Sequence, residues 1–176
     1  TPGIESYSAD VHFFAGLPLV VVRTASPMSR RSCLSRLSKS TPIILPSMLK
    51  CDFGNLEHEV RQLEEAGVSA IHLDVMDGHF VPNLTYGMPI VEGLRRLTTL
   101  PLDTHLMITR PENYVQQFYD AGADMITIHC EATDRPRQVL ETIRDLGAGA
   151  GIAINPGTPL SQLEPCVDVC DLVLTM

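Results

Sequence analysis

The stretch Ile71-His72-Leu73-Asp74-Val75-Met76 decides the fold and the chemistry predicted for this chain. Apolar residues at every second position predict a β-strand, in which side chains two residues apart point to the same face. His72, Asp74 and Met76 would then share one face, opposite the apolar positions. A polar imidazole and carboxylate on one face of a buried strand indicate a functional site rather than packing alone.

A second stretch, Thr104-His105-Leu106-Met107, repeats this pattern downstream, so that His105 and Met107 would share a face of another strand. Two imidazoles and one carboxylate are enough to hold a divalent transition metal while leaving coordination positions open. The neighbouring thioethers would make the surroundings poor in water and polarisable. The combination predicts metal-assisted chemistry on an oxygenated carbon.

Outward from these stretches, the chain alternates apolar strands with amphipathic helices. Strands are predicted to begin near residues 43, 68, 102, 124, 149 and 171. This alternation is typical of a parallel sheet with covered faces, which leaves an open doubly wound sheet or part of a (β/α)₈ barrel. No GxGxxG or GxxxxGK[ST] motif follows the first strand. Polar residues instead stand near the carboxyl ends of several strands, where barrel active sites assemble, and this favours the barrel. These residues are Ser47, Asp74, His105, His129 and Asn155.

The composition predicts a globular chain of about one domain, with 176 residues, 44% hydrophobic residues and a net charge of −8. The acidic body would repel nucleic acid and anionic lipid, so neither nucleic acid nor membrane is an expected partner. An anionic substrate stays compatible if backbone N–H groups and a metal supply local positive charge. The five cysteines show no CxxC pair, which predicts free thiols in a reducing compartment such as the cytoplasm.

Residues 1–40 differ from residues 41–176 and are predicted to be a poorly structured extension. They hold five of the 13 basic residues and only two of the 21 acidic ones. The apolar run Phe13–Val22 is too short to span a bilayer. The serine-rich, basic stretch Arg23–Ser40 suits an organellar transit peptide, which would place the protein in a plastid or another organelle. The alternative is a mis-assigned start, with Met28 as the true first residue.

Several motifs resemble the ribulose-phosphate 3-epimerase family. They are Ile44–Leu49, His72–Asn83, Asp103–Met107, His129–Ala132 and Asn155–Leu160. The resemblance runs from about Ile43 to Met176, and it implies a (β/α)₈ TIM-type barrel. The family interconverts ribulose 5-phosphate and xylulose 5-phosphate with the help of a divalent metal.

By this resemblance, His72, Asp74 and His105 match metal ligands, and Asp74 also matches one of two acid/base carboxylates. Ser47 and His105 match residues beside the substrate. Met76, Met107 and Met176 match the methionines that line the reaction centre. The expected metal is Zn²⁺ or Fe²⁺, with Mn²⁺ or Co²⁺ as further options. The second acid/base aspartate and the phosphate-binding glycines belong to later strands, so we expect about six βα units here, with the last strands missing.

The expected function is therefore metal-dependent epimerisation at C3 of a phosphorylated pentulose, ribulose 5-phosphate, through an enediolate. One alternative is an epimerase of a related ketose phosphate such as allulose 6-phosphate. Another is an inactive metal-binding fragment. The sequence leaves a homo-oligomer open.

Overall fold

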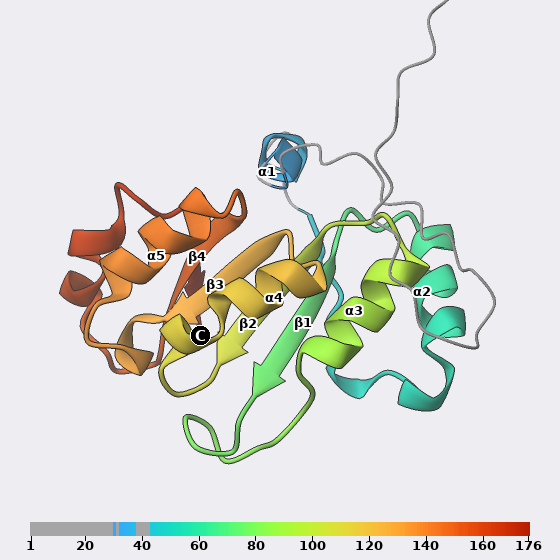
Figure 1. The fold of residues 1–176 in the computed structure, drawn as a ribbon, viewed down its shortest axis with the longest axis horizontal. Coiled ribbons are helices and arrows are strands. Elements are labelled where there is room, and N and C mark those ends of the chain that lie inside the picture. The colour runs from blue at the N-terminus through green and yellow to red at the C-terminus, as the bar shows by residue number, and fades with distance from the viewer. Residues whose placement is uncertain (1–29, 31, 38–42) are drawn as a thin grey trace, which may run out of the picture.

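The computed structural model describes residues 30, 32–37 and 43–176 of the chain. Its centre is a parallel sheet of five strands that neighbour one another in chain order (Figure 1). The strands are β1 (Ile71–Met76), β2 (Leu102–Met107), β3 (Met125–His129), β4 (Gly149–Ile154) and β5 (Leu172–Thr175). A doubly wound sheet reverses its strand order at a switch point, whereas a barrel wall does not. The observed order is that of a barrel wall.

Two helices precede β1 in the chain, α1 (Ser32–Leu37) and α2 (Leu56–Glu65). Three more join successive strands from β1 to β4 and cover one face of the sheet: α3 (Met88–Leu97), α4 (Val115–Ala121) and α5 (Pro136–Asp145). Helix α3 contacts both α2 and α4, while α4 and α5 contact β3. Figure 1 shows α3, α4 and α5 in a row along the sheet. This arrangement leaves the opposite face of the strands as the inner face of the barrel wall.

The register of the strands sorts side chains between these two faces. Leu73, Thr104, Ile126 and Ala150 are paired across β1 to β4, and all four are buried against the helices. On the inner face, Asp74 is paired with His105, and His105 with Thr127. Because side chains alternate along a strand, the register that aligns one set of residues against the helices also aligns the polar residues on the inner face.

Local sequence signals set where several helices begin and end. The Asp52 side chain accepts a hydrogen bond from the Gly54 N–H and so caps the short 3₁₀ helix that precedes α2. Pro136 is the first residue of α5, where its missing N–H costs nothing. Helix α4 ends at Gly122, whose φ of 116° lies in a region that side chains with a Cβ rarely adopt.

The first expected strand, Ile43–Ser47, is not a strand in the structure, and this part of the prediction is wrong. The segment makes one isolated parallel bridge, between Ser47 and His72, beside a hydrogen bond from the His72 N–H to the Pro46 carbonyl. Pro46 has no backbone N–H to donate, so the segment cannot form a continuous ladder of hydrogen bonds with β1. Between β4 and β5 the chain forms two 3₁₀ turns, Leu160–Gln162 and Glu164–Cys166.

Most of residues 1–40 lie outside the described residues, so the predicted extension, with its transit-peptide and Met28 alternatives, stays a prediction. The described part includes α1, in which Cys33 is buried. The Arg30 guanidinium lies 4.1 Å from the centre of the Tyr119 ring and also donates to the Tyr119 carbonyl. The start of this segment is thereby attached to the end of α4.

None of the helices in the described ranges is both long enough and apolar enough to cross a membrane.

Candidate metal centre

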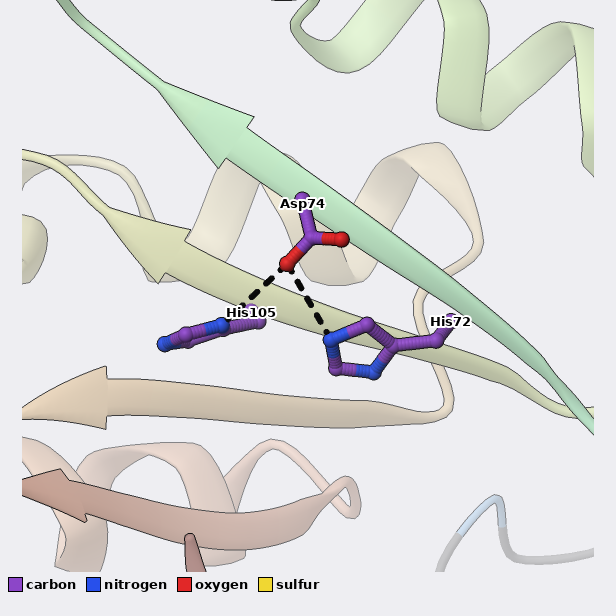
Figure 2. Close-up of side chains that lie close together, drawn as sticks. All are labelled: His72, Asp74 and His105. Carbon is purple, nitrogen blue, oxygen red and sulfur yellow. Dashed lines mark ion pairs between the residues drawn. The ribbon is translucent and has the colours of Figure 1, made fainter. Parts of the chain in front are cut away.

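Three side chains on the inner face of β1 and β2 form a compact group of metal-ligand type. His72 and Asp74 come from β1 and His105 from β2, and Figure 2 shows the carboxylate between the two imidazoles. Asp74 Oδ1 lies 3.2 Å from His72 Nε2 and 3.4 Å from His105 Nδ1. Among the residues that the structure describes, no other group of three or more histidine, cysteine or acidic side chains has this proximity.

The chemistry of the group fits a divalent transition metal. One ligand atom from each residue lies within 4.8 Å of the others, and the set offers two nitrogens and one oxygen. Zn²⁺ and Fe²⁺ accept such mixed sets, and three protein ligands leave positions open for another ligand, as in catalytic rather than structural sites. The predicted ligand residues are thus brought together by the fold.

Asp103 orients His72 from behind. Its Oδ2 lies 2.8 Å from His72 Nδ1, and its side chain is only 3% exposed. If Nδ1–H donates to this carboxylate, the lone pair of Nε2 faces the ligand group. Burial alone would lower the pKa of His72, but the hydrogen bonds to Asp103 and Asp74 outweigh it and raise the pKa to about 10. A metal bound to Nε2 must therefore displace a proton.

Asp74 is held as a carboxylate. Burial alone would raise its pKa, but hydrogen bonds from His105, His72 and Ser47 hold it well below its usual range. Ser47 Oγ donates to Asp74 Oδ2 at 2.5 Å, which leaves Oδ1 to face the two imidazoles. The two carboxylate oxygens thus have different surroundings, one beside a hydroxyl and one at the metal position.

The outer edge of β1 is completed by side chains from the loop that follows it. Tyr86 Oη accepts a hydrogen bond from the Asp74 N–H at 3.1 Å, and burial raises the pKa of this phenol. Thr85 Oγ1 accepts from the Met76 N–H and donates to the Asp74 carbonyl. These bonds take the place of a neighbouring strand, so the backbone that carries Asp74 is held on both sides.

Asp77 anchors the same loop through three backbone N–H groups. Its Oδ1 accepts from the His79 and Phe80 N–H groups, and its Oδ2 accepts from the Thr109 N–H at 2.8 Å. Burial would raise the pKa of Asp77, but these N–H donors lower it to about 2. The carboxylate therefore ties the loop after β1 to the end of β2.

His129 lies behind His105 and is 1% exposed. Its Nε2 is 2.8 Å from His105 Nε2, and its Nδ1 is 3.3 Å from Glu131 Oε2. Burial and the neighbouring His105 lower the pKa of His129. It does not belong to the ligand group. Its end-of-strand position had suggested a functional role without indicating which one.

The structure brings together two of the three predicted methionines. Met76 and Met107 are paired in register at the ends of β1 and β2, next to the ligand group. Met176 follows β5 and is 58% exposed, so the described structure does not bring it to the other two.

Two residues at the centre were missed by the sequence analysis, Asp103 and Glu131. The signal for Asp103 was available, because it lies two residues before His105 and must share its face in a strand. Glu131 carries no such signal, since it follows the end of β3 in a 3₁₀ turn, Cys130–Ala132, whose direction a periodic pattern does not define.

Comparisons with known proteins bear on the family and the fold of this chain. The model of the ribulose-phosphate 3 epimerase family matches residues 43–176. Ribulose-5-phosphate-3-epimerase, chloroplastic, of Arabidopsis thaliana is 47% identical over 156 residues, which are 88% of this chain and 56% of the relative. Ribulose-phosphate 3-epimerase of Bacillus subtilis is 46% identical over 133 residues, 76% of this chain and 61% of the relative. The chain thus spans about three fifths of the length of these relatives.

Solved structures support the fold alone. 3-Keto-L-gulonate-6-phosphate decarboxylase from Vibrio cholerae is similar with a TM-score of 0.59 and 18% identity, over 74% of this chain and 59% of that one. A mutant tryptophan synthase α-subunit from Pyrococcus furiosus gives a TM-score of 0.56 at 16% identity, over 74% of this chain and 64% of that one.

Proposed function

Because this chain belongs to the ribulose-phosphate 3-epimerase family, we propose that it carries the metal centre and one acid/base carboxylate for epimerisation at C3 of ribulose 5-phosphate. The observation that carries the proposal is the group of His72, Asp74 and His105, whose ligand atoms lie within 4.8 Å of one another. His72 Nε2, His105 Nδ1 and Asp74 Oδ1 would hold the metal.

In this proposal Asp74 removes the proton from C3. A bound divalent cation would stabilise the negative charge that develops on two neighbouring substrate oxygens. Asp74 can accept a proton because it is ionised at neutral pH, and its Oδ2 lies away from the imidazoles, next to Ser47 Oγ. Ser47 is the proposed substrate-binding residue, because its exposed hydroxyl orients Oδ2 and can turn toward a substrate oxygen. His105, as a ligand, also borders the substrate position.

Met76 and Met107 would form the apolar wall of the reaction centre. Met107 is 5% exposed and lies beside Met76, and a thioether cannot donate a proton to a carbanionic intermediate. We extend the same role to Met176 by resemblance to the family. The preferred metals are Zn²⁺ or Fe²⁺, with Mn²⁺ and Co²⁺ as alternatives.

The family and the composition support proposals for the substrate, the partners and the compartment. The relatives' names favour ribulose 5-phosphate over allulose 6-phosphate, and a working enzyme over an inactive metal-binding fragment. We propose a phosphorylated pentulose as the substrate and no nucleic-acid or membrane partner, with a homo-oligomer to be tested by sedimentation. The cytoplasm is the proposed compartment. The plastid is the alternative, supported by the Arabidopsis relative named chloroplastic. Its match covers 156 residues, which is more than the segment 43–176 that matches the family model.

The test separates proton removal from inversion. The full chain is incubated with ribulose 5-phosphate in D₂O, and NMR follows deuterium at C3 and the appearance of xylulose 5-phosphate. We expect exchange that a chelator abolishes and Zn²⁺ or Fe²⁺ restores. Asp74→Asn should lower it by about 10²- to 10⁴-fold. The exposed Asp120→Asn on α4 is the matched control and should leave it unchanged.

Exchange that resists the chelator would remove the metal from the proposal, and exchange that survives Asp74→Asn would remove Asp74 as the base. Allulose 6-phosphate in the same assay tests the alternative substrate. Metal binding without exchange on either substrate would favour the inactive fragment.

A further inference from the structure

Two side chains stand in line behind His105, on the side away from the ligand group. His129 comes from the end of β3, and Glu131 from the turn that follows. The contacts run from His105 Nε2 to His129 Nε2 at 2.8 Å and from His129 Nδ1 to Glu131 Oε2 at 3.3 Å. Both imidazoles are 1% exposed, so water is not an available substitute partner.

With a metal in place of the proton on His105 Nδ1, one tautomer of each ring satisfies this line. His105 faces Asp74 with Nδ1, and a neutral imidazole that ligates through Nδ1 carries its proton on Nε2. His105 Nε2–H then donates to His129 Nε2, which must be the acceptor. His129 in turn carries its proton on Nδ1 and donates it to Glu131. Each assignment requires the next one.

The far end of the line is fixed to the framework. Glu131 Oε1 accepts a hydrogen bond from the Asn155 N–H at 2.8 Å, at the end of β4. Phe80, in the loop after β1, lies with its ring centre 4.8 Å from that of His129. His129 is therefore held by three parts of the sheet: β2 through His105, the loop after β1 through Phe80, and the end of β4 through Glu131.

Resting on the function proposed above, we propose that His129 and Glu131 are positioning residues that hold His105 in the tautomer and orientation in which Nδ1 binds the metal. Metal-ligating histidines generally donate their second ring N–H to an oriented acceptor, most often a carboxylate or a carbonyl. Here a second histidine stands between the ligand and the carboxylate. Asp103 does the same for His72 directly, with the opposite ring nitrogen.

The geometry does not suit His129 to a more direct role. Its Nε2 faces the back of His105 rather than Asp74, so it does not join the ligand group. The ring centre of Phe80 lies 4.8 Å from that of His129, and His105 and Glu131 already contact the two ring nitrogens of His129, so neither nitrogen is available to a substrate.

The experiment measures Zn²⁺ affinity of the full chain by competition with a chromophoric chelator. His129→Phe keeps the volume but removes the acceptor, and should weaken Zn²⁺ binding by about 10- to 100-fold. His129→Gln places an amide oxygen near the position of Nε2 and should restore most of the loss. His58→Phe, at an exposed site of α2, is the matched control and should bind Zn²⁺ as the unchanged chain does.

A second readout detects the tautomer itself. In ¹⁵N-histidine-labelled, Zn²⁺-loaded protein, long-range ¹H–¹⁵N spectra should show His105 protonated on Nε2 and His129 protonated on Nδ1. Glu131→Ala leaves His129 in place and should shift its proton toward Nε2, with weaker Zn²⁺ binding. This variant keeps the test valid if His129→Phe fails to fold.

The outcomes separate this proposal from the function on which it rests. If the unchanged chain binds Zn²⁺ and His129→Phe binds it equally well, or if His105 is protonated on Nδ1, the positioning role is overturned while the metal centre stands. If His129→Gln is as weak as His129→Phe, general packing rather than an acceptor explains the loss, and the proposal also fails. If the unchanged chain binds none of Zn²⁺, Fe²⁺, Mn²⁺ and Co²⁺, the proposed function itself is refuted.

Discussion

Gly151 of β4 allows the close approach of β3 and β4 on the inner face, and replacing it with alanine tests the packing there. Gly151 is paired in register with Thr127. A Cβ at position 151 would lie 2.8 Å from Thr127 Cβ and 3.1 Å from Thr127 Cα, and would overlap with Thr127 Oγ1. Non-bonded carbons prefer separations of about 3.5–4.0 Å. The backbone of the partner strand cannot yield without moving the register.

We therefore expect Gly151→Ala to destabilise the fold by about 1–3 kcal/mol, the usual cost of overpacking a tight core. Gly93→Ala, inside α3, is the matched control. A Cβ there meets nothing closer than Arg96 Nη2 at 3.9 Å, so the same chemical change should stabilise by about 0.4–1 kcal/mol. The two glycines differ in space, and the predicted changes differ in sign.

Thr127→Ala tests how much of the clash with the new Cβ comes from the Thr127 hydroxyl. Among the described residues the buried Thr127 hydroxyl has no hydrogen-bond partner, so its removal offsets the lost methyl group, worth about 0.8 kcal/mol, and the single change should be nearly neutral. In the double variant the overlap with Oγ1 disappears while that with Cβ remains. The two changes should couple favourably by about 0.5–3 kcal/mol.

Urea unfolding followed by circular dichroism measures these differences, with the m-value as a check on the unfolded state. Two results would refute the reasoning. One is a Gly151→Ala variant that is as stable as Gly93→Ala. The other is additivity of Gly151→Ala and Thr127→Ala within about 0.5 kcal/mol.

Three further predictions concern the metal centre and its loop. Asp103→Asn can offer its amide N–H₂ to His72 Nδ1 and favour a proton on the metal-facing Nε2, so Zn²⁺ should bind about 10- to 100-fold more weakly in chelator competition; unchanged affinity would contradict the role of Asp103. Zn²⁺ at 100 times its dissociation constant should raise the free energy of unfolding by about 2.7 kcal/mol, and Asp74→Ala should abolish the rise; an equal rise in both would place the metal elsewhere. The pKa of Asp77, about 2, lies below its unfolded value of about 3.9, so its contribution to stability is present above about pH 4 and is lost as the pH falls toward 2. Asp77→Asn should show a smaller loss of stability over that range in urea titrations; parallel pH curves for the two proteins would count against the three N–H contacts.

Much of the fold could be predicted because local rules and burial agree. The alternation in Ile71–Met76 placed His72 and Asp74 on one face, and the structure confirms both the strand and the shared face. Asp52 as the cap of a 3₁₀ turn and Gly122 as the end of α4 follow from their residue types alone. These signals are local, because a strand's side-chain period and a helix's end depend only on neighbouring residues.

The failures came where a residue's partner lies far away in the chain. The segment Ile43–Ser47 has the composition of a strand, but its pairing depends on which donors face β1, and Pro46 has none to offer. His129 was recognised as a polar residue at a strand end. Its position behind His105 depends on how β2 and β3 pair, and the local sequence does not contain that register.

The sequence by itself determined which atoms are available for chemistry: two imidazoles and a carboxylate, with the spacing that puts them on inner faces of adjacent strands. Only the tertiary structure decided which atom of each faces the centre. Asp103 turns His72 so that Nε2 points inward, and His129 receives His105 so that Nδ1 does. The reason is that ring orientation and tautomer are set by hydrogen bonds between strands, and these exist only once the register of the sheet has brought their donors and acceptors together.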